Sequence, residues 1–304
     1  MEDASGGGGG RVHLGVFCTL DHYPEADGAV GTVYGRALNE AVLAEDVGLE
    51  SFWVTEHHFS PYGVCPDPAV LLATMAARTR RLRLGTATAI LPLDHPLRTA
   101  ERYALLDQLS GGRLEFGIGA AWAANEHEMY AIPGLDHRVG LFSEGLQVMR
   151  SLWTQERTDF SGRYYTMSNA VANPKPVQKP YPPIWIGSGG PAMLRLTARH
   201  ADVWNASGAA GQDVATAAAA SRQLDEACEA IGRNPAEIRR SVQVAAGAGP
   251  TELLERIGGF ADAGFTEVIV MMSGGSMQTA SDPASTAAMV AERVLPELQG
   301  YRPA

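Results

Sequence analysis

The stretch LRLGTAT at residues 82–88, with PLRTAERYALLDQL at 96–109, SGG at 110–112 and RLEFGI at 113–118, decides the fold. An apolar run of strand length is followed by a segment with helical spacing, which begins at a proline and stops at paired glycines. A second apolar run follows at once. This is a strand–helix–strand unit, and such units place their two strands parallel with a right-handed crossover.

The same alternation continues in both directions from this unit. Strands are expected at Val12–Phe17, Ser51–Val54, Leu82–Thr88, Arg113–Ile118, Ile184–Gly187, Asp202–Asn205, Arg240–Ala246 and Thr266–Met271. Helices are expected at Thr32–Val47, Pro68–Thr79, Pro96–Leu109, Val139–Trp153, Ala192–His200, Ala215–Ile231, Thr251–Ala263 and Ala284–Leu298. Eight strand–helix units predict an α/β protein with a closed (β/α)8 TIM barrel, in preference to an open doubly wound sheet.

Two segments depart from this rhythm. Residues 156–183 hold an aromatic run around Phe160 and then five prolines, which predict an inserted hairpin followed by an extended connection. Residues 1–10 end in five successive glycines and predict a flexible lead. We therefore expect one barrel domain over residues 11–304, with no second domain boundary.

Composition narrows the function classes. The formal charge of −10, from 24 basic and 34 acidic residues, argues against nucleic-acid binding. Three widely spaced cysteines (Cys18, Cys65 and Cys228) without a Cys-x-x-Cys pair argue against disulfides and structural zinc, and this favours a cytoplasmic protein. No uncharged apolar run reaches 18 residues, so no membrane span is expected.

The densest chemistry lies in Trp53-Val54-Thr55-Glu56-His57-His58-Phe59, which runs off the end of the second predicted strand. In a TIM barrel the C-terminal ends of the strands face the active site, where a histidine can exchange protons near neutral pH. The alternative is a structural histidine hydrogen-bonded to Glu56, and the spacing leaves both open. Adjacent histidines point in different directions, so no metal site is expected.

Small residues and glycines follow the later strands. The run Leu84–Ala89 would let a flat ring approach the backbone, or would allow close strand packing at Gly85. Gly117-Ile118-Gly119 is not a dinucleotide fingerprint, because Trp122 stands where the third glycine belongs.

The best phosphate site is the loop Ile186–Pro191, where glycines and a helix N-terminus would present N–H groups to an anion. An ordinary glycine-rich turn is the alternative. Arg138, which precedes the fourth helix, would add positive charge to the same phosphate, although a lone arginine is more often a surface ion-pair partner.

Taken together, these stretches resemble the bacterial luciferase-like monooxygenase family, a group of flavin-binding barrels, over about residues 11–300. The motifs that carry the resemblance are Glu56-His57-His58-Phe59 with Tyr62-Gly63, Arg83-Leu84-Gly85-Thr86, Leu91-Pro92 with His95-Pro96, Leu106–Arg113, Pro182–Gly187 and Ala201-Asp202-Val203-Trp204. Each motif is weak alone, but their order and spacing together are specific.

The resemblance implies roles by position. His57 matches the family's catalytic histidine, and Ala87 with Thr88 match the small pair beneath the isoalloxazine ring, often joined by a cis peptide. The full set of implied cofactor contacts is Ala87, Thr88, Gly119, Arg138, Ser188, Gly189 and Gly190. The implied substrate contacts are Phe17, His58, Trp122 and Trp204.

The expected function is therefore that of a monooxygenase that uses reduced FMN and dioxygen to oxygenate a small organic substrate. The resemblance also implies a separate flavin reductase that supplies the reduced flavin, and a homodimer.

Two departures keep alternatives open. Many relatives carry a phosphate-binding arginine where this chain has Ala120-Ala121-Trp122, and Ala120–Glu128 with Asn173–Gln178 look like deazaflavin-dependent members. The alternatives are a hydride-transferring oxidoreductase that uses the deazaflavin coenzyme, and a non-catalytic flavin-binding barrel.

Overall fold

The computed structural model describes residues 11–187, 189–207, 213–246, 249–271 and 288–299. The predicted glycine-rich lead (1–10), Ser188 and residues 284–287 of the last predicted helix lie outside the described residues.

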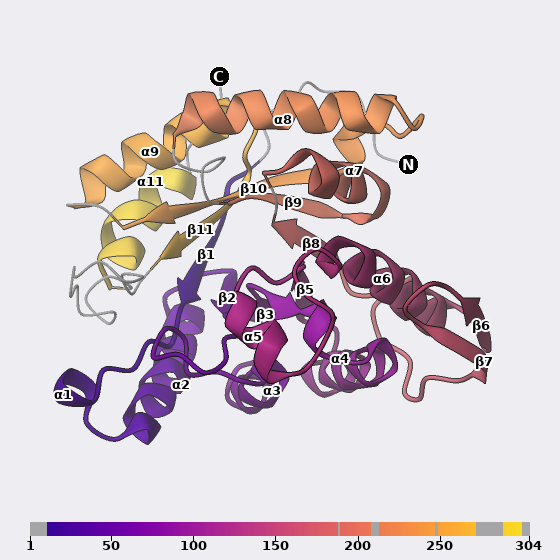
Figure 1. Cartoon of the computed structure of the whole chain (residues 1–304). Coiled ribbons are helices and arrows are strands. Elements are labelled where there is room, and N and C mark those ends of the chain that lie inside the picture. The colour runs from indigo at the N-terminus through magenta and orange to yellow at the C-terminus, as the bar shows by residue number, and fades with distance from the viewer. Residues whose placement is uncertain (1–10, 188, 208–212, 247–248, 272–287, 300–304) are drawn as a thin grey trace.

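Eight parallel strands of the described chain close into a barrel (Figure 1). In order around the cylinder they are β1 (His13–Cys18), β2 (Ser51–Val54), β3 (Arg83–Thr86), β5 (Leu114–Gly119), β8 (Ile184–Gly187), β9 (Val203–Ala206), β10 (Arg239–Ala245) and β11 (Glu267–Met271). Pairing of β3 with β5 and of β11 with β1 completes the ring. The predicted (β/α)8 TIM barrel is confirmed.

Helices alternate with these strands and cover the outside of the barrel (Figure 1). They are α2 (Val30–Asp46), α3 (Pro68–Arg78), α4 (Pro96–Ser110), α6 (Arg138–Thr154), α7 (Pro191–His200), α8 (Val214–Glu229), α9 (Pro250–Asp262) and α11 (Leu295–Gln299). A π-helical turn, Val290–Val294, leads into α11. Four of these helices begin with a proline, whose fixed φ suits the first helical position.

Several short elements lie between the regular units. The inserted segment contains the predicted hairpin, formed by antiparallel β6 (Thr158–Ser161) and β7 (Thr166–Ala170) beside α6. The remaining short elements are α1 (Pro24–Asp27), α5 (Ala124–Met129), β4 (Ala89–Ile90), and 3₁₀ turns at Leu91–Leu93 and Pro235–Glu237. Neither α1 nor α5 was predicted, because four and six residues are too few to show a helical period.

Alternate residues of each strand face either the barrel interior or the helices. The interior cluster consists of Phe17, Trp53, Trp185, Val203 and Ile269, each at most 5% exposed. The larger core lies between strands and helices. The same alternation directs the last inward residue of each strand toward the barrel mouth.

Gly85 on β3 makes room for the indole of Trp53 on β2. A Cβ atom at Gly85 would lie 2.1 Å from Cε3 of Trp53, which is 1% exposed. The indole N–H donates to Ser51 Oγ at 2.8 Å, and the ring meets that of Trp185 edge-on at 4.4 Å. Of the two interpretations of this glycine, close packing between strands is therefore the one that the structure supports.

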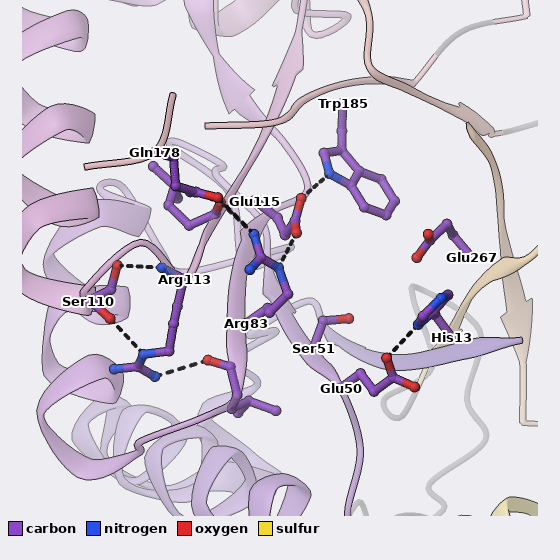
Figure 2. Close-up of polar contacts among 12 residues, drawn as sticks. His13, Glu50, Ser51, Arg83, Ser110, Arg113, Glu115, Gln178, Trp185 and Glu267 are labelled. Atoms are coloured by element: carbon purple, nitrogen blue, oxygen red, sulfur yellow. Dashed lines mark hydrogen bonds and ion pairs between the residues drawn. The ribbon is translucent and has the colours of Figure 1, made fainter. Parts of the chain in front are cut away.

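The N-terminal ends of the strands form a polar base beneath these indoles (Figure 2). Glu115 is 4% exposed, is paired with Arg83, and accepts the indole N–H of Trp185 at 2.5 Å. Arg83 also donates to Gln178 Oε1 at 3.1 Å. Burial raises the pKa of Glu115, and the charge of Arg83 opposes this shift. The base thus closes the barrel with paired charges and leaves the opposite end for a site.

The motif Leu106–Arg113 has a structural role. Gly111 ends α4 in the left-handed conformation, at φ 68°. Arg113 then donates to the carbonyl oxygens of Ser110, Leu82 and Ala76 at 2.7–2.9 Å, and part of this cluster is visible in Figure 2. One guanidinium therefore ties the ends of two helices to the start of a strand.

Candidate active site

A cavity of about 630 Å3 opens at the C-terminal ends of the barrel strands. Its floor contains Phe17, Trp53, Trp185 and Ile269 from the interior cluster. Eight of the residues predicted for the site line this one cavity, namely Phe17, His57, Ala87, Thr88, Gly119, Trp122, Arg138 and Gly189. Its size and mixed apolar and polar lining are typical of a cofactor site.

Ala87 and Thr88 lie directly after β3, on one wall of the cavity. They are joined by a cis peptide bond, as the resemblance implied. Across from them, a Cβ atom at Gly119 would lie 2.3 Å from Thr88 Oγ1. A side chain at position 119 would therefore clash with Thr88. The glycine lets these two segments approach closely and form one wall of the cavity.

His57 projects from the loop after β2 and is held from several sides. Its backbone N–H donates to Cys65 O at 3.3 Å, and its ring lies 4.7 Å from that of Tyr62. Gly63 has a φ of +75°, and a Cβ atom there would lie 2.9 Å from His57 Cδ2. The glycine therefore allows the imidazole to pack against the backbone of its own loop.

Two carboxylates lie near this ring. Glu126, from α5, is 1% exposed and has Oε1 3.6 Å from His57 Nδ1. Asp21, from the loop after β1, accepts the backbone N–H of Gly63 at 3.0 Å. Burial raises the pKa of Asp21, while hydrogen bonds from Thr19 and Gly63 and the charge of His57 lower it. His57 thus lies beside two carboxylates that come from separate segments of the barrel mouth.

His58 has a different role from its neighbour. Its Nε2 lies 3.0 Å from Glu56 Oε1, and its Nδ1 lies 2.9 Å from the hydroxyl of Tyr130. The second oxygen of Glu56 accepts the backbone N–H of Ile90 at 3.0 Å. Glu56 therefore pairs with His58 and leaves His57 free of it. Both ring nitrogens of His58 are engaged, but His58 also lines a second pocket beside the cavity, so its contact with a substrate stays a prediction.

One end of the cavity is suited to an anion. Arg138 begins α6 and lines the cavity, and it forms no ion pair with any other described residue. Gly189 lines the same cavity, and α7 begins two residues later. An arginine without a carboxylate partner and a loop at a helix N-terminus, both in one cavity lining, fit a phosphate group.

A second pocket of about 610 Å3 adjoins the cavity and shares His57, Tyr62 and Trp122 with it. Its remaining wall comes from the loop after β2 and from α5 and its approach. Trp122 is 68% exposed and lies edge-on to His57, with 6.0 Å between the ring centroids. These three rings therefore separate the barrel cavity from a more open pocket.

Trp204 corrects the prediction for the substrate wall. It is fully buried on the outer side of β9 and packs against Phe265, with ring centroids 5.9 Å apart. Its neighbour Asn205 points inward and lines the cavity. The prediction missed the correct face by one residue, because side chains alternate along a strand.

Two predicted cofactor contacts are not among the described lining residues of the cavity. Gly190 lies at the N-cap of α7, outside the lining residues, and Ser188 lies outside the described residues. Inward residues that were not predicted for the site include Trp185, Asn205, Gln243 and Met271. Because side chains alternate along a strand, Trp185 shares its face with Gly187, and Asn205 shares its face with Val203. This alternation could have identified both residues. No local signal connects Glu126 with His57.

Among the residues that the structure describes, no group of three or more histidine, cysteine, aspartate or glutamate side chains is arranged to hold a metal ion. No helix there is long and apolar enough to cross a bilayer.

Characterised relatives include enzymes with different cofactors. The chain is 32% identical over 216 residues to an F420-dependent glucose-6-phosphate dehydrogenase of Kineococcus radiotolerans, covering 69% of this chain and 63% of that protein. It is 29% identical over 161 residues to the oxygenase component of a flavin-dependent trigonelline monooxygenase of Acinetobacter baylyi, covering 52% and 44%. The chain thus spans less than two thirds of the length of these relatives.

Similarity to a solved structure extends over nearly the whole chain. The crystal structure of the monooxygenase RslO1 from Streptomyces bottropensis superposes with a TM-score of 0.80 at 25% identity, covering 94% of this chain and 99% of that one. The family model described as luciferase-like monooxygenase matches residues 12–256. With the barrel, the mouth cavity and this match in agreement, the chain belongs to the luciferase-like monooxygenase family.

Proposed function

We propose that this chain is a monooxygenase that uses reduced FMN and dioxygen to oxygenate a small organic substrate. One observation carries the proposal. A proton-transfer group (His57), a wall of small residues (Ala87 and Thr88) and an anion-binding end (Arg138) line the same cavity. Reduced FMN would supply the electrons that activate dioxygen. The protein would bind the FMN, exclude water from the cavity and move a proton.

The residues present fit FMN at both of its ends. The phosphate would lie between the Arg138 guanidinium and the loop at Gly189, where positive charge is otherwise unmatched within the described chain. The isoalloxazine ring would lie against Ala87 and Thr88, above the floor made by Trp53 and Trp185. These apolar surfaces would keep water from the reacting face.

The organic substrate would enter through the second pocket. That pocket meets the cavity at His57, Tyr62 and Trp122, so a substrate there would reach the imidazole from the side opposite the barrel floor. In this arrangement His57 would move a proton to or from the reacting atoms. Trp122 would supply a flat apolar surface for the substrate.

The proposal includes a separate reductase that delivers reduced flavin. The trigonelline monooxygenase relative is named as an oxygenase component, which supports a two-component arrangement here.

Flavin binding tests the cofactor assignment. We expect FMN to quench tryptophan emission, because Trp53, Trp122 and Trp185 line the cavity. Arg138→Ala should weaken FMN binding about 10- to 100-fold, the effect of losing charge-assisted hydrogen bonds of about 1.5–3 kcal/mol. Riboflavin lacks the phosphate and should bind both forms equally. Arg157→Ala is the matched control, since Arg157 contacts Asn169 in the hairpin, away from the cavity.

Turnover tests the reaction. With chemically reduced FMN, dioxygen and a panel of organic substrates, we expect an oxygenated product, and His57→Asn should lower its rate of formation about 100-fold with FMN affinity unchanged. Equal rates in the two proteins would remove His57 from the mechanism.

The second candidate is hydride transfer with the deazaflavin coenzyme F420. The identity to the F420-dependent dehydrogenase over 69% of this chain favours it. A titration that gives tight F420 binding and no FMN binding would replace the first proposal with this one.

A further inference from the structure

The buried carboxylate of Glu126 is more than a hydrogen-bond acceptor for the backbone. Its Oε1 accepts the backbone N–H of His58 at 3.1 Å and lies 3.6 Å from His57 Nδ1. Its Oε2 is buried and has no hydrogen-bond partner in the described part of the chain. Burying a carboxylate that lacks full hydrogen bonding is unfavourable, so a charge at this position requires an explanation beyond one backbone contact.

His57 is oriented so that only one of its ring nitrogens faces this carboxylate. Gly63 packs against Cδ2 of the ring, and this contact limits rotation of the imidazole. The other titratable groups near the ring are Asp21 and Tyr62, on separate loops. Within the described residues, His57 Nε2 forms no hydrogen bond, whereas Nδ1 has Glu126 beside it.

We propose that Glu126 is a positioning residue that holds a proton on Nδ1 of His57 and so leaves Nε2 as the nitrogen that exchanges protons in the cavity. The tautomer of a histidine is set by the partner of one ring nitrogen, and a carboxylate beside Nδ1 selects the Nδ1–H form. The 3.6 Å separation is longer than a hydrogen bond, and such contacts tighten when a ligand fills the site. The catalytic consequence rests on the proposed function, whereas the position of the ring proton does not.

Glu126→Gln isolates the charge. The amide oxygen can still accept the His58 N–H, and the side-chain volume is nearly unchanged. Glu128→Gln is the matched control, because Glu128 lies on the same helix, is exposed and loses the same charge. Glu126→Asp keeps the carboxylate, but its side chain is one methylene shorter, so the charge lies farther from Nδ1 of His57. Thermal melts of all three variants would show whether they fold as the parent does.

Nitrogen-15 spectra of the histidine rings give the direct measurement, with His57 assigned from the spectrum of His57→Asn. In the full chain without added cofactor, we expect the Nδ1–H form in the parent and in Glu128→Gln. We expect mainly the Nε2–H form in Glu126→Gln and a mixture in Glu126→Asp. If the ring proton stays on Nδ1 in both Glu126 variants, the inference is wrong.

A second measurement separates this inference from the proposed function. Protein-bound, chemically reduced FMN is mixed with dioxygen, and we expect its rate of reoxidation to change at least 10-fold, in the same direction, in Glu126→Gln and His57→Asn. FMN affinity should be unchanged in both variants. A shifted tautomer with parental reoxidation in both would support the placement of the proton by Glu126 and contradict the role of His57 in the reaction. An unshifted tautomer with altered reoxidation only in His57→Asn would support the role of His57 in the reaction and contradict the placement of the proton by Glu126.

Discussion

Replacing Gly85 with alanine should force Trp53 out of its place in the barrel interior. The new Cβ atom would lie 2.1, 2.3 and 2.5 Å from three atoms of the six-membered ring of the indole, closer than any real contact. Neither partner can yield easily, because Trp53 is 1% exposed and Gly85 pairs with it in the strand register.

The magnitude follows from what the indole would lose. Overpacking of a core costs about 1–3 kcal/mol. Loss of the edge-on contact with Trp185 adds about 0.5–1.5 kcal/mol, and loss of the hydrogen bond to Ser51 adds about 1 kcal/mol. We therefore expect Gly85→Ala to lower the free energy of unfolding by about 3–5 kcal/mol, a fall in Tm of about 5–8 °C for a chain of 304 residues.

The assay is urea and thermal unfolding of a double-mutant cycle with Trp53→Ala, which removes all three clashing atoms. In the Trp53→Ala background, Gly85→Ala should cost less than about 1 kcal/mol, because the clash is gone. Gly35→Ala is the control, since Gly35 lies inside α2 with open space around it and should be neutral or stabilising. An equal loss in both backgrounds would refute the packing explanation of Gly85.

Three further predictions use other parts of the molecule. Burial and Arg150 lower the pKa of His200 to about 4 from 6.5, so its neutral form supports folding at neutral pH, and stability is lost as pH falls from 6.5 to about 4. In His200→Gln that loss, followed by urea unfolding, should be smaller by about 1–2 kcal/mol after allowance for partial solvent exposure; an unchanged loss would contradict it. Burial raises the pKa of Cys65 to about 12, so its thiol should not react with a water-soluble disulfide reagent at pH 8 until the protein unfolds, and rapid labelling of the native protein would count against this. Trp204→Phe should preserve the fraction of tryptophan emission quenched by FMN, whereas Trp185→Phe should reduce it; equal effects would contradict the placement of Trp204 outside the barrel.

Most of the barrel was predictable because its information is local. Each predicted strand overlaps an observed barrel strand, with ends that differ by at most two residues. The predicted helix stop at Ser110-Gly111-Gly112 coincides with a left-handed helix end. The phase of a strand is harder to predict when both faces are buried. On β9 both Trp204 and Asn205 are buried, so polarity alone suggested the wrong inward residue.

Contacts between distant segments were not predictable from one sequence. His57 precedes Glu126 by 69 positions, and nothing near either residue indicates the other. The two adjacent histidines look equivalent in the sequence, yet Glu56 and Tyr130 engage both nitrogens of His58, and only His57 faces the cavity. Such distinctions depend on how loops from several strands meet at the mouth.

The guanidinium of Arg113 has a consequence for how relatives are recognised. It joins α3, α4 and the approach to β3 through backbone carbonyls, and none of its partners lies in the cavity. These contacts hold the scaffold and do not depend on which redox molecule the cavity binds. The motif Leu106–Arg113 therefore identifies the barrel and does not distinguish an enzyme that uses FMN from one that uses F420.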